Sequence, residues 1–336
     1  MIITVTPNPS LDRTYDVERL VVGEVNRAER THLDPGGKGI NVSRTLVRHG
    51  RSTLAVLPVG GPDGAELVEA LDALDVPTRT VPVDGAIRSN VAVVDGVGVT
   101  TKINASGPLL GPLEVAALVA AVEHEVDRAG QDDRVWVVLA GSVPAGAESL
   151  YPRLVEVARS RGAAVAVDAS GADLARVVES TRTTLLKPNL EELSELVGEA
   201  PVTVGEIVAC ARRLVARGHE QVLVSLGPDG ALLVDAGASW WAGGEPLVPR
   251  STVGAGDCTL AGFLGASGDD GARLRTAVAW GRAATRLPGS AAPAPHDIRE
   301  DDVHVVLEPD ASARPGELAA QAASSTPISN QGEHHV

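Results

Sequence analysis

The fold class can be predicted from one stretch of the sequence, RVWVVLAGSVPAGAESLYPRLVEVARSRGAAVAV, residues Arg134–Val167. It begins and ends with apolar runs, Arg134–Ala140 and Ala163–Val167, which are typical of strands buried on both faces. Between them, apolar residues follow the helical spacing i, i+4, i+7 and i+8: Leu150, Leu154, Val157 and Ala158. A strand, a helix and a second strand in this order predict parallel strands whose sheet is covered by the helix.

The same alternation runs through most of the chain. Further apolar runs predict four more strands: Ile2–Thr6, Thr53–Val59, Thr184–Leu186 and Gln221–Ser225. A second helical stripe follows Gly111–Pro112 and comprises Leu113, Ala117, Ala120 and Ala121. We therefore expect an α/β fold with a doubly wound, mostly parallel sheet and helices on both of its faces.

Two segments break this rhythm. Tyr15–Leu33 mixes apolar and charged residues and shows no clear helix, and Ser89–Asn104 is typical of a hairpin. The hairpin strands are expected at Asn90–Val94 and Val97–Lys102, around a turn at Asp95–Gly96. Insertions of this kind predict a small β-lid beside the main sheet, formed by residues of about 13–33 and 88–104.

The chain is expected to form a single domain over residues 1–310. Beyond Asp310 the composition shifts to Ala, Ser, Pro, Gly and Gln without periodicity. A segment of that kind buries little apolar surface, so residues 311–336 are predicted to be a disordered tail.

Composition excludes several classes of protein. The 336 residues include 29 Lys and Arg against 44 Asp and Glu, a net charge of −15, which argues against general binding to nucleic acid or to anionic membranes. Apolar runs are far shorter than the roughly 18 residues of a membrane span, and the chain does not open with a basic, apolar leader. Cys210 and Cys258 supply neither a disulfide framework nor metal-ligand spacing, so a cytoplasmic protein is expected.

The strongest local motif is STVGAGDC, residues 251–258. The small residues Gly254, Ala255 and Gly256 would let backbone N–H groups at a helix start approach an anion, and the carboxylate of Asp257 follows directly. An anion hole beside a carboxylate suits phosphoryl transfer to a hydroxyl, in which Asp257 takes the proton. The alternative is a glycine-rich turn whose aspartate merely favours the helix dipole.

Two motifs lie toward the start of the chain. In DPGGKGINV, residues 34–42, a glycine-rich turn places Lys38 before a helix and Asn41 within it; the alternative is a turn with a solvated lysine. The spacings of the P-loop and of the dinucleotide fingerprint are both absent from this motif. In TVTPNPSLD, residues 4–12, a strand ends in a polar turn whose Asp12 can accept protons from sugar hydroxyls; the alternative is an Asx turn.

Two further motifs follow strand candidates. In KPNLEE, residues 187–192, Asn189 and Glu192 share one helix face and can hold hydrated Mg²⁺, although an N-cap with a capping-box acid explains the same pattern. SLGPDG, residues 225–230, is a strand followed by a tight turn and is uninformative alone.

The order of these motifs resembles the PfkB-type, ribokinase-like carbohydrate kinases, from about Thr6 to about Pro295. TPNPSLD, GGKGINVSR, AGSVP, KPNLEEL, VSLGPDG and STVGAGD are most similar to the branch of 1-phosphofructokinase and tagatose-6-phosphate kinase. This resemblance implies a doubly wound sheet with a small β-lid, and a kinase that uses ATP and Mg²⁺.

The resemblance also assigns roles to residues. Asp257 matches the catalytic base, with Gly254, Ala255 and Gly256 as the anion hole. Residues matched to the nucleotide phosphates and Mg²⁺ are Lys187, Asn189 and Glu192, and those lining the ATP pocket are Ser225, Gly227 and Thr252. Sugar-binding positions are matched by Asp12, Gly37, Lys38, Asn41 and Ser142. The acceptor phosphate is assigned to Arg88, joined from the lid by Arg27.

The expected reaction is phosphorylation of fructose 1-phosphate to fructose 1,6-bisphosphate. Tagatose 6-phosphate and fructose 6-phosphate are alternative acceptors, and a non-catalytic sensor of sugar phosphates is the alternative from another class. The lid strands could also pair two chains as a homodimer. Two residues depart from the family pattern: Cys258 stands where serine is usual, as a packed residue or a reactive thiol, and Trp280 lies where small residues are common near the adenine.

Overall fold

The computed structural model describes residues 1–130 and 134–325, and its centre is a ten-stranded sheet with the strand order β14-β13-β12-β11-β10-β9-β8-β1-β4-β5. Seven neighbouring strands are parallel: β1 (Ile2–Val5), β4 (Thr53–Val59), β5 (Thr78–Pro82), β8 (Trp136–Ala140), β9 (Ala164–Asp168), β10 (Leu185–Leu186) and β11 (Gln221–Ser225). Three antiparallel strands extend the sheet: β12 (Ala231–Val234), β13 (Ser239–Gly243) and β14 (His304–Leu307). The doubly wound, mostly parallel sheet expected from the apolar runs is confirmed.

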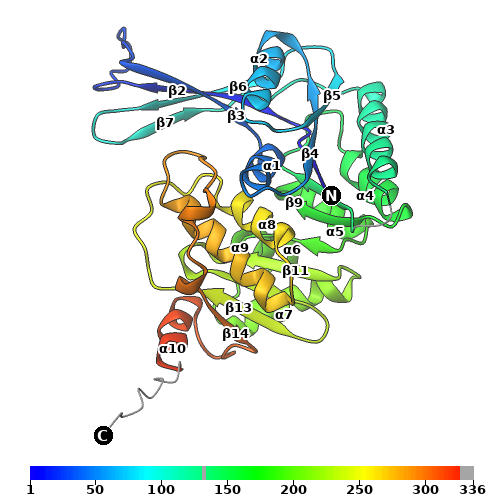
Figure 1. Ribbon diagram of the computed structural model, residues 1–336, viewed down its shortest axis with the longest axis vertical. Coiled ribbons are helices and arrows are strands. Elements are labelled where there is room, and N and C mark those ends of the chain that lie inside the picture. Colours follow the sequence, from blue (N-terminus) through cyan, green and yellow to red (C-terminus); the bar gives the residue numbers. More distant parts are fainter. Residues whose placement is uncertain (131–133, 326–336) are drawn as a thin grey trace, which may run out of the picture.

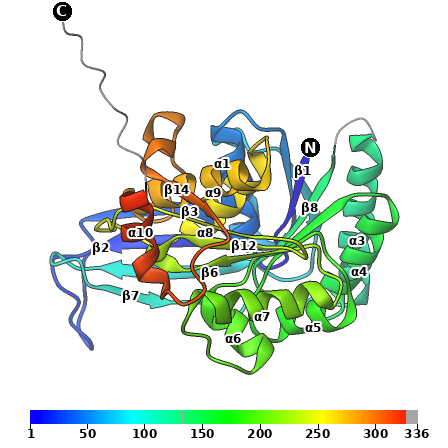
Figure 2. The same cartoon turned by 90° about the horizontal axis from the view of Figure 1, so that it is seen from below.

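Helices cover both faces of this sheet (Figure 2). One face carries α3 (Pro112–Ala129), α4 (Leu150–Ser160), α5 (Gly171–Ser180), α6 (Leu190–Val197) and α7 (Val204–Ala216). The other carries α1 (Lys38–Arg48), α8 (Ala255–Gly265) and α9 (Asp270–Thr285), while α2 (Gly61–Asp72) packs beside α1. Strand β8 contributes side chains to the hydrophobic core on each face of the sheet. Val137 and Leu139 face the first set of helices, and Trp136 and Val138 face the second.

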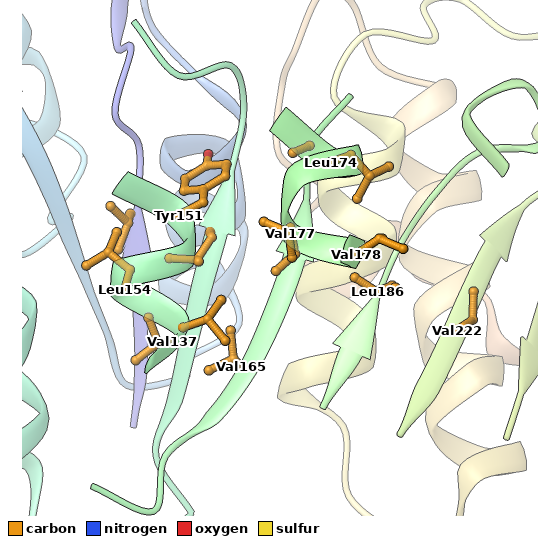
Figure 3. Packing of buried hydrophobic residues seen from close by; sticks show 14 of the residues in the cluster. Val137, Tyr151, Leu154, Val165, Leu174, Val177, Val178, Leu186 and Val222 are labelled. Carbon is orange, nitrogen blue, oxygen red and sulfur yellow. The ribbon is translucent and has the colours of Figure 1, made fainter. Parts of the chain in front are cut away.

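The first core is built from aliphatic side chains with few aromatics. Figure 3 shows Leu154 of α4 against Val137 and Val165 of the strands, with Val177 of α5 beyond them. The predicted stripe of α4 is confirmed, since Leu150, Leu154 and Ala158 are buried.

In α3 the helix is confirmed but its predicted face is wrong. Leu113 is 85% exposed, and Ala117 and Ala120 are exposed as well. Of the predicted stripe only Ala121 is buried, together with Val115, Leu118, Val119, Val122 and Val126. Larger aliphatic side chains remove more apolar area from water than alanine does, so they decide which face of this alanine-rich helix packs inward.

A separate four-stranded sheet, called here the small sheet, has the order β3-β2-β6-β7 and extends away from the main body (Figure 1). Its strands are β2 (Ser10–Asp16), β3 (Arg30–Gly36), β6 (Arg88–Val94) and β7 (Thr100–Ile103). The two irregular segments thus do form a sheet, but the predicted hairpin turn is too short. The Asp95 carboxylate accepts hydrogen bonds from the backbone N–H groups of Val97 and Val99, which draws both residues into the turn.

Residues 311–325 do not form the irregular tail that composition predicted. The backbone N–H groups of Val204 and Gly205 bond to the carbonyls of Ala313 and Ala311, and Ala313 and Leu318 are buried. A final helix, α10 (Leu318–Ser325), follows; the rest of the predicted tail, 326–336, lies outside the described residues. Within the described ranges, every helix is too short or too polar to cross a bilayer.

Candidate active site

Most of the predicted site residues lie at the edge of the main sheet where the parallel strands end. From β1 the chain builds β4 and β5 to one side and then β8, β9, β10 and β11 to the other, so the strand order reverses at β1. In open α/β sheets this reversal leaves a crevice at the carboxyl ends of the strands, where ligands bind. Asn8 and Ser142, which follow β1 and β8, mark that crevice, and the Asn8 side-chain amide donates to the Ser142 hydroxyl at 3.2 Å.

Asp168, the last residue of β9, joins two lysines at this edge. Its carboxylate oxygens lie 2.7 Å from Lys38 Nζ and 2.8 Å from Lys187 Nζ. Burial would raise the pKa of Asp168, but the two ammonium groups outweigh burial and lower it. Burial would likewise lower the pKa of Lys38, and the adjacent Asp168 reverses this and raises it. Both lysines therefore pair with the same carboxylate.

Asp257 lies in the first turn of α8, buried and 6% exposed. The Asn41 side-chain amide of α1 donates a hydrogen bond of 2.8 Å to Asp257 Oδ2. Burial and the negative charge of Asp168 raise the pKa of Asp257 to about 7, against the opposing effects of Asn41 and the lysines. A carboxylate that titrates near neutral pH is suited to act as a general base. Its burial and its contact with Asn41 disfavour the alternative of a surface acid that merely favours the helix dipole.

The start of α8 has the geometry of an anion site. Gly254 is the N-cap residue and has a φ of 78°, a left-handed conformation that glycine adopts without strain. The first N–H groups of a helix have no carbonyl partner within the helix, and they point out of its N-terminus. A Cβ atom at Gly256 would lie 3.4 Å from Lys187 Nζ, so this cation stands directly beside the helix start.

The turn before α1 requires glycine for a similar reason. Gly37 has a φ of 127°, and a Cβ atom there would lie 2.6 Å from Thr6 Cγ2. The turn brings Lys38 to Asp168 and Asn41 to Asp257, which disfavours the alternative of a lysine held only by solvent.

Residues predicted for the acceptor side lie on the small sheet. Asp12 sits in β2, not in an Asx turn, and its Oδ1 accepts hydrogen bonds from Asn90 Nδ2 at 2.8 Å and from Ser10 Oγ at 2.7 Å. Arg88 begins β6, is half-buried, and donates from Nε to the Asn8 carbonyl at 3.2 Å. Burial lowers the pKa of Arg88, and the nearby Asp12 opposes that shift.

The residues that the sequence predicts to bind the nucleotide lie at the ends of β10 and β11. Asn189 forms an isolated bridge with Ser225, and Gly227 begins a turn directly after β11. Thr252 is exposed just before α8. The strand order thus brings Lys187, Ser225 and Gly227 to one stretch of the same edge.

Asn189 and Glu192 form the capping box that was the alternative to a metal site. Asn189 Oδ1 accepts from the Glu192 N–H at 2.8 Å, and Glu192 Oε2 accepts from the Asn189 N–H at the same distance. Over residues 1–130 and 134–325, histidines, cysteines and carboxylates nowhere gather in threes as metal ligands would.

Three other predicted residues lie apart from this constellation. Arg27 is exposed in the connection between β2 and β3, at the outer end of the small sheet (Figure 1). Trp280 is buried in the core and stacks on His49 at 3.7 Å between ring centroids, so it does not face a nucleotide pocket. Burial raises the pKa of Cys258 to about 12, and its thiol contacts the Thr45 hydroxyl, which is the behaviour of a packed residue and not of a reactive thiol.

Asp168 is the central residue that sequence reasoning missed. Its signal was present, since an acid directly follows the continuous apolar run of β9 at the end where ligands collect. Asn8 and Asn90 were also missed, although Asn8 lies inside a motif that was singled out.

Comparison with known proteins adds to this geometry. The sequence model described as "pfkB family carbohydrate kinase" matches residues 5–290. The 1-phosphofructokinase of Bacillus subtilis (strain 168) is 38% identical over 265 residues, which cover 79% of this chain and 84% of that protein. The ATP-dependent 6-phosphofructokinase isozyme 2 of Mycobacterium tuberculosis (strain ATCC 25618 / H37Rv) is 36% identical, covering 77% of this chain and 76% of its own.

Solved structures share the architecture. Phosphofructokinase-2 of Escherichia coli superposes with a TM-score of 0.81 at 28% identity, over 96% of this chain and 99% of that one. Ribokinase of Arabidopsis thaliana superposes with a TM-score of 0.67 at 22% identity, over 88% of this chain and 96% of that one, which shows a common fold.

Proposed function

The chain belongs to the pfkB family of carbohydrate kinases, and we propose that this ATP-dependent sugar-phosphate kinase converts fructose 1-phosphate to fructose 1,6-bisphosphate. The observation that carries the proposal is the buried Asp257, placed between the N-terminus of α8 and the Asn41 amide and beside two charged lysines. Relatives named 1-phosphofructokinase support the choice of acceptor.

The chemistry assigned to Asp257 is removal of one proton. The C6 hydroxyl oxygen of the sugar attacks the γ-phosphorus of ATP while its proton passes to the Asp257 carboxylate. The bond between the γ-phosphorus and the bridging oxygen breaks, and ADP leaves with that electron pair. A pKa of about 7 leaves Asp257 largely ionised above neutral pH, as a base must be.

Negative charge that develops on the transferred group needs fixed positive partners. The N–H groups of residues 254–256 and the ammonium of Lys187 lie at the start of α8, as charge stabilisation requires. Asp168 fixes Lys187 and Lys38 by ion pairs, so little reorganisation is needed when charge moves. Ser225, Gly227 and Thr252 are proposed to line the nucleotide pocket.

We propose that Mg²⁺ enters with the nucleotide and not as a resident ion. Glu192 uses Oε2 in the capping box, which leaves its second carboxylate oxygen for a metal-bound water. One carboxylate with water and phosphate oxygens suits Mg²⁺, which neutralises nucleotide phosphate charge when bound.

The acceptor is assigned to the small sheet and the crevice below it. Asp12, Asn41 and Ser142, with the turn at Gly37, are proposed to contact sugar hydroxyls, and Arg88 the acceptor phosphate. Arg27 joins Arg88 only if the connection between β2 and β3 moves toward the site when the small sheet closes. Closure would also exclude water from the transferred phosphoryl group.

Ile103 of the small sheet and Val97 and Val99 in its turn between β6 and β7 are exposed apolar residues, and they support a further proposal that two chains associate through this sheet. A concentration-independent monomer mass in sedimentation would exclude this association. We also propose that the enzyme acts in the cytoplasm, where its two substrates occur together.

The second candidate acceptor is a ketohexose 6-phosphate, favoured by the relative named 6-phosphofructokinase isozyme 2. Turnover with MgATP should be measured side by side on fructose 1-phosphate, fructose 6-phosphate and tagatose 6-phosphate. We expect kcat/KM to favour fructose 1-phosphate about a hundredfold, or about 2.7 kcal/mol of transition-state discrimination. A preference for either 6-phosphate would overturn the acceptor but keep the kinase chemistry.

A further inference from the structure

A pocket of about 370 Å³ opens at the edge of the main sheet where β1 and β8 begin. Its walls are the starts of these strands, the turn after α1 and the turn between α8 and α9. We call it the arginine pocket, after Arg51, Arg134 and Arg273, which line it together with Trp136.

The arginine pocket is distinct from the active site. Helix α8 carries Asp257 in its first turn and ends at Gly265, which lines the pocket. At about 1.5 Å per residue, the helix rises about 12 Å between these two residues. Strand β8 separates the two sites as well. Trp136, which lines the arginine pocket, begins this strand, whereas Ser142, at the crevice of the active site, follows its end.

Charge sets the pocket apart from its surroundings. The protein has a net charge of −15, yet three arginines and no carboxylate are among the residues lining this hollow. Three other surface hollows of the described chain each include at least one acid, such as Glu192, Asp127 or Asp301. Positive charge gathered in a concave site attracts anions.

Two of the guanidinium groups gather around one aromatic ring. The Cζ atoms of Arg134 and Arg273 lie 4.9 Å and 6.0 Å from the centroid of Trp136, and Arg273 also lies 4.0 Å over Phe263. Burial lowers the pKa of Arg273; the carboxylate of Asp270 opposes this shift, and the like charge of Arg134 adds to it. The aliphatic stem of Arg51 packs against the end of α8, because a Cβ atom at Gly265 would lie 3.4 Å from Arg51 Cγ.

Within the described chain, ion pairs and hydrogen bonds involve only one of the three arginine side chains. Arg273 lies 3.5 Å from Asp270 and donates from Nε to the Phe263 carbonyl at 3.4 Å, so it caps the end of α8. Over residues 1–130 and 134–325, neither Arg51 nor Arg134 has an ion pair or a hydrogen bond from its side chain. Arg51 and Arg134 are exposed, so their N–H donors are available to a ligand.

We propose that the arginine pocket binds a small phosphate-bearing anion, either inorganic phosphate or the phosphate group of a metabolite. Guanidinium groups present paired N–H donors that match phosphate oxygens, and three of them around one hollow can surround a single phosphate. The volume suits a small ligand, and the ring of Trp136 holds two of the cations in place through its face.

Equilibrium dialysis of the full chain against radiolabelled inorganic phosphate tests this proposal. The Arg51→Gln/Arg134→Gln variant is compared with Arg212→Gln/Arg299→Gln, which removes two exposed arginines outside the pocket. Because the acceptor site itself could take phosphate, each pair is also made in an Arg88→Gln background. Turnover of each pair alone verifies folding, since all four side chains lie outside the catalytic machinery.

We expect the pocket variant to bind one equivalent of phosphate at least about tenfold more weakly in both backgrounds, as loss of charge-assisted hydrogen bonds predicts. The control pair should retain that equivalent. Displacement of the label by glycerol 3-phosphate would assign the site to a phosphate ester, and failure to displace it would assign inorganic phosphate. Unchanged binding in the pocket variant, or an equal loss in the control pair, would overturn the proposal.

Discussion

The carboxyl edge of the main sheet and the small sheet contribute to one site in different ways. At the edge, Asp168, Lys187 and Asp257 are buried and joined to neighbours from other elements by short contacts. In the small sheet, all of β6 is half-buried and all of β7 is exposed.

This difference separates two tasks. Packing of helices against the main sheet fixes the groups that we propose for phosphoryl transfer, and groups fixed in advance favour electrostatic catalysis. The residue proposed to contact the acceptor phosphate, Arg88, lies on the small sheet, whose strands β6 and β7 contain no buried residue. Changes at the edge should therefore lower kcat, and changes on the small sheet should mainly raise the KM for the sugar phosphate.

The largest effect is expected for Asp257→Asn. Loss of the base should lower kcat by about 10³-fold with little change in ATP binding, measured by steady-state kinetics and by calorimetric titration of nucleotide. Asp72→Asn, an exposed acid on α2, is the matched control. Turnover of Asp257→Asn at the parental rate would show that another group accepts the proton.

The same variant should change stability with a defined sign. The raised pKa of Asp257 means that the folded protein retains a proton that the unfolded chain loses above about pH 4, so ionisation of Asp257 lowers stability as pH rises toward 7. Asp257→Asn should therefore gain in free energy of unfolding relative to the parent across this window.

The next largest effect is expected for Asp168→Asn. Removing the charge that joins Lys38 and Lys187 should lower kcat about a hundredfold and the free energy of unfolding by about 3 kcal/mol, measured by kinetics and by urea unfolding. Asp235→Asn, a turn residue between β12 and β13, provides the control. Full activity in Asp168→Asn would mean that the lysines need no fixed partner.

Arg88→Gln tests the small sheet. We expect KM for the acceptor to rise between about tenfold and a hundredfold while kcat stays close to that of the parent, because a charge-assisted contact to the bound phosphate is lost. A fall in kcat with an unchanged KM would place Arg88 among the transfer groups and break the distinction between the two regions.

The smallest effect is expected for Arg27→Gln. Its guanidinium is exposed at the far end of the small sheet, so its contribution is that of a solvated charge, and KM should rise less than about threefold. A rise as large as that of Arg88→Gln, in the same assay, would require the connection between β2 and β3 to reach the acceptor phosphate.

Local patterns predicted some of these features and missed others. Continuous apolar runs predicted the parallel strands, because such strands are buried on both faces. Glycine-rich turns predicted where α1 and α8 begin. Asp168 pairs with Lys38, which lies 130 positions away in the chain, and with Lys187, so no local motif contains these ion pairs. The buried face of α3 and the packing of Ala313 depended likewise on neighbours distant in the chain.

The most direct test of a preformed transfer site is the pH dependence of kcat/KM for the parent and for Asp168→Asn, measured on the same substrates. Titration of the substrates is common to both enzymes, so a difference between the profiles reports Asp257. In the parent we expect the acidic limb to have its midpoint near pH 7. The negative charge of Asp168 helps to raise the pKa of Asp257, so in Asp168→Asn the midpoint should move to lower pH. A midpoint that stays in place or moves upward would contradict the assignment of Asp257 as a base tuned by Asp168.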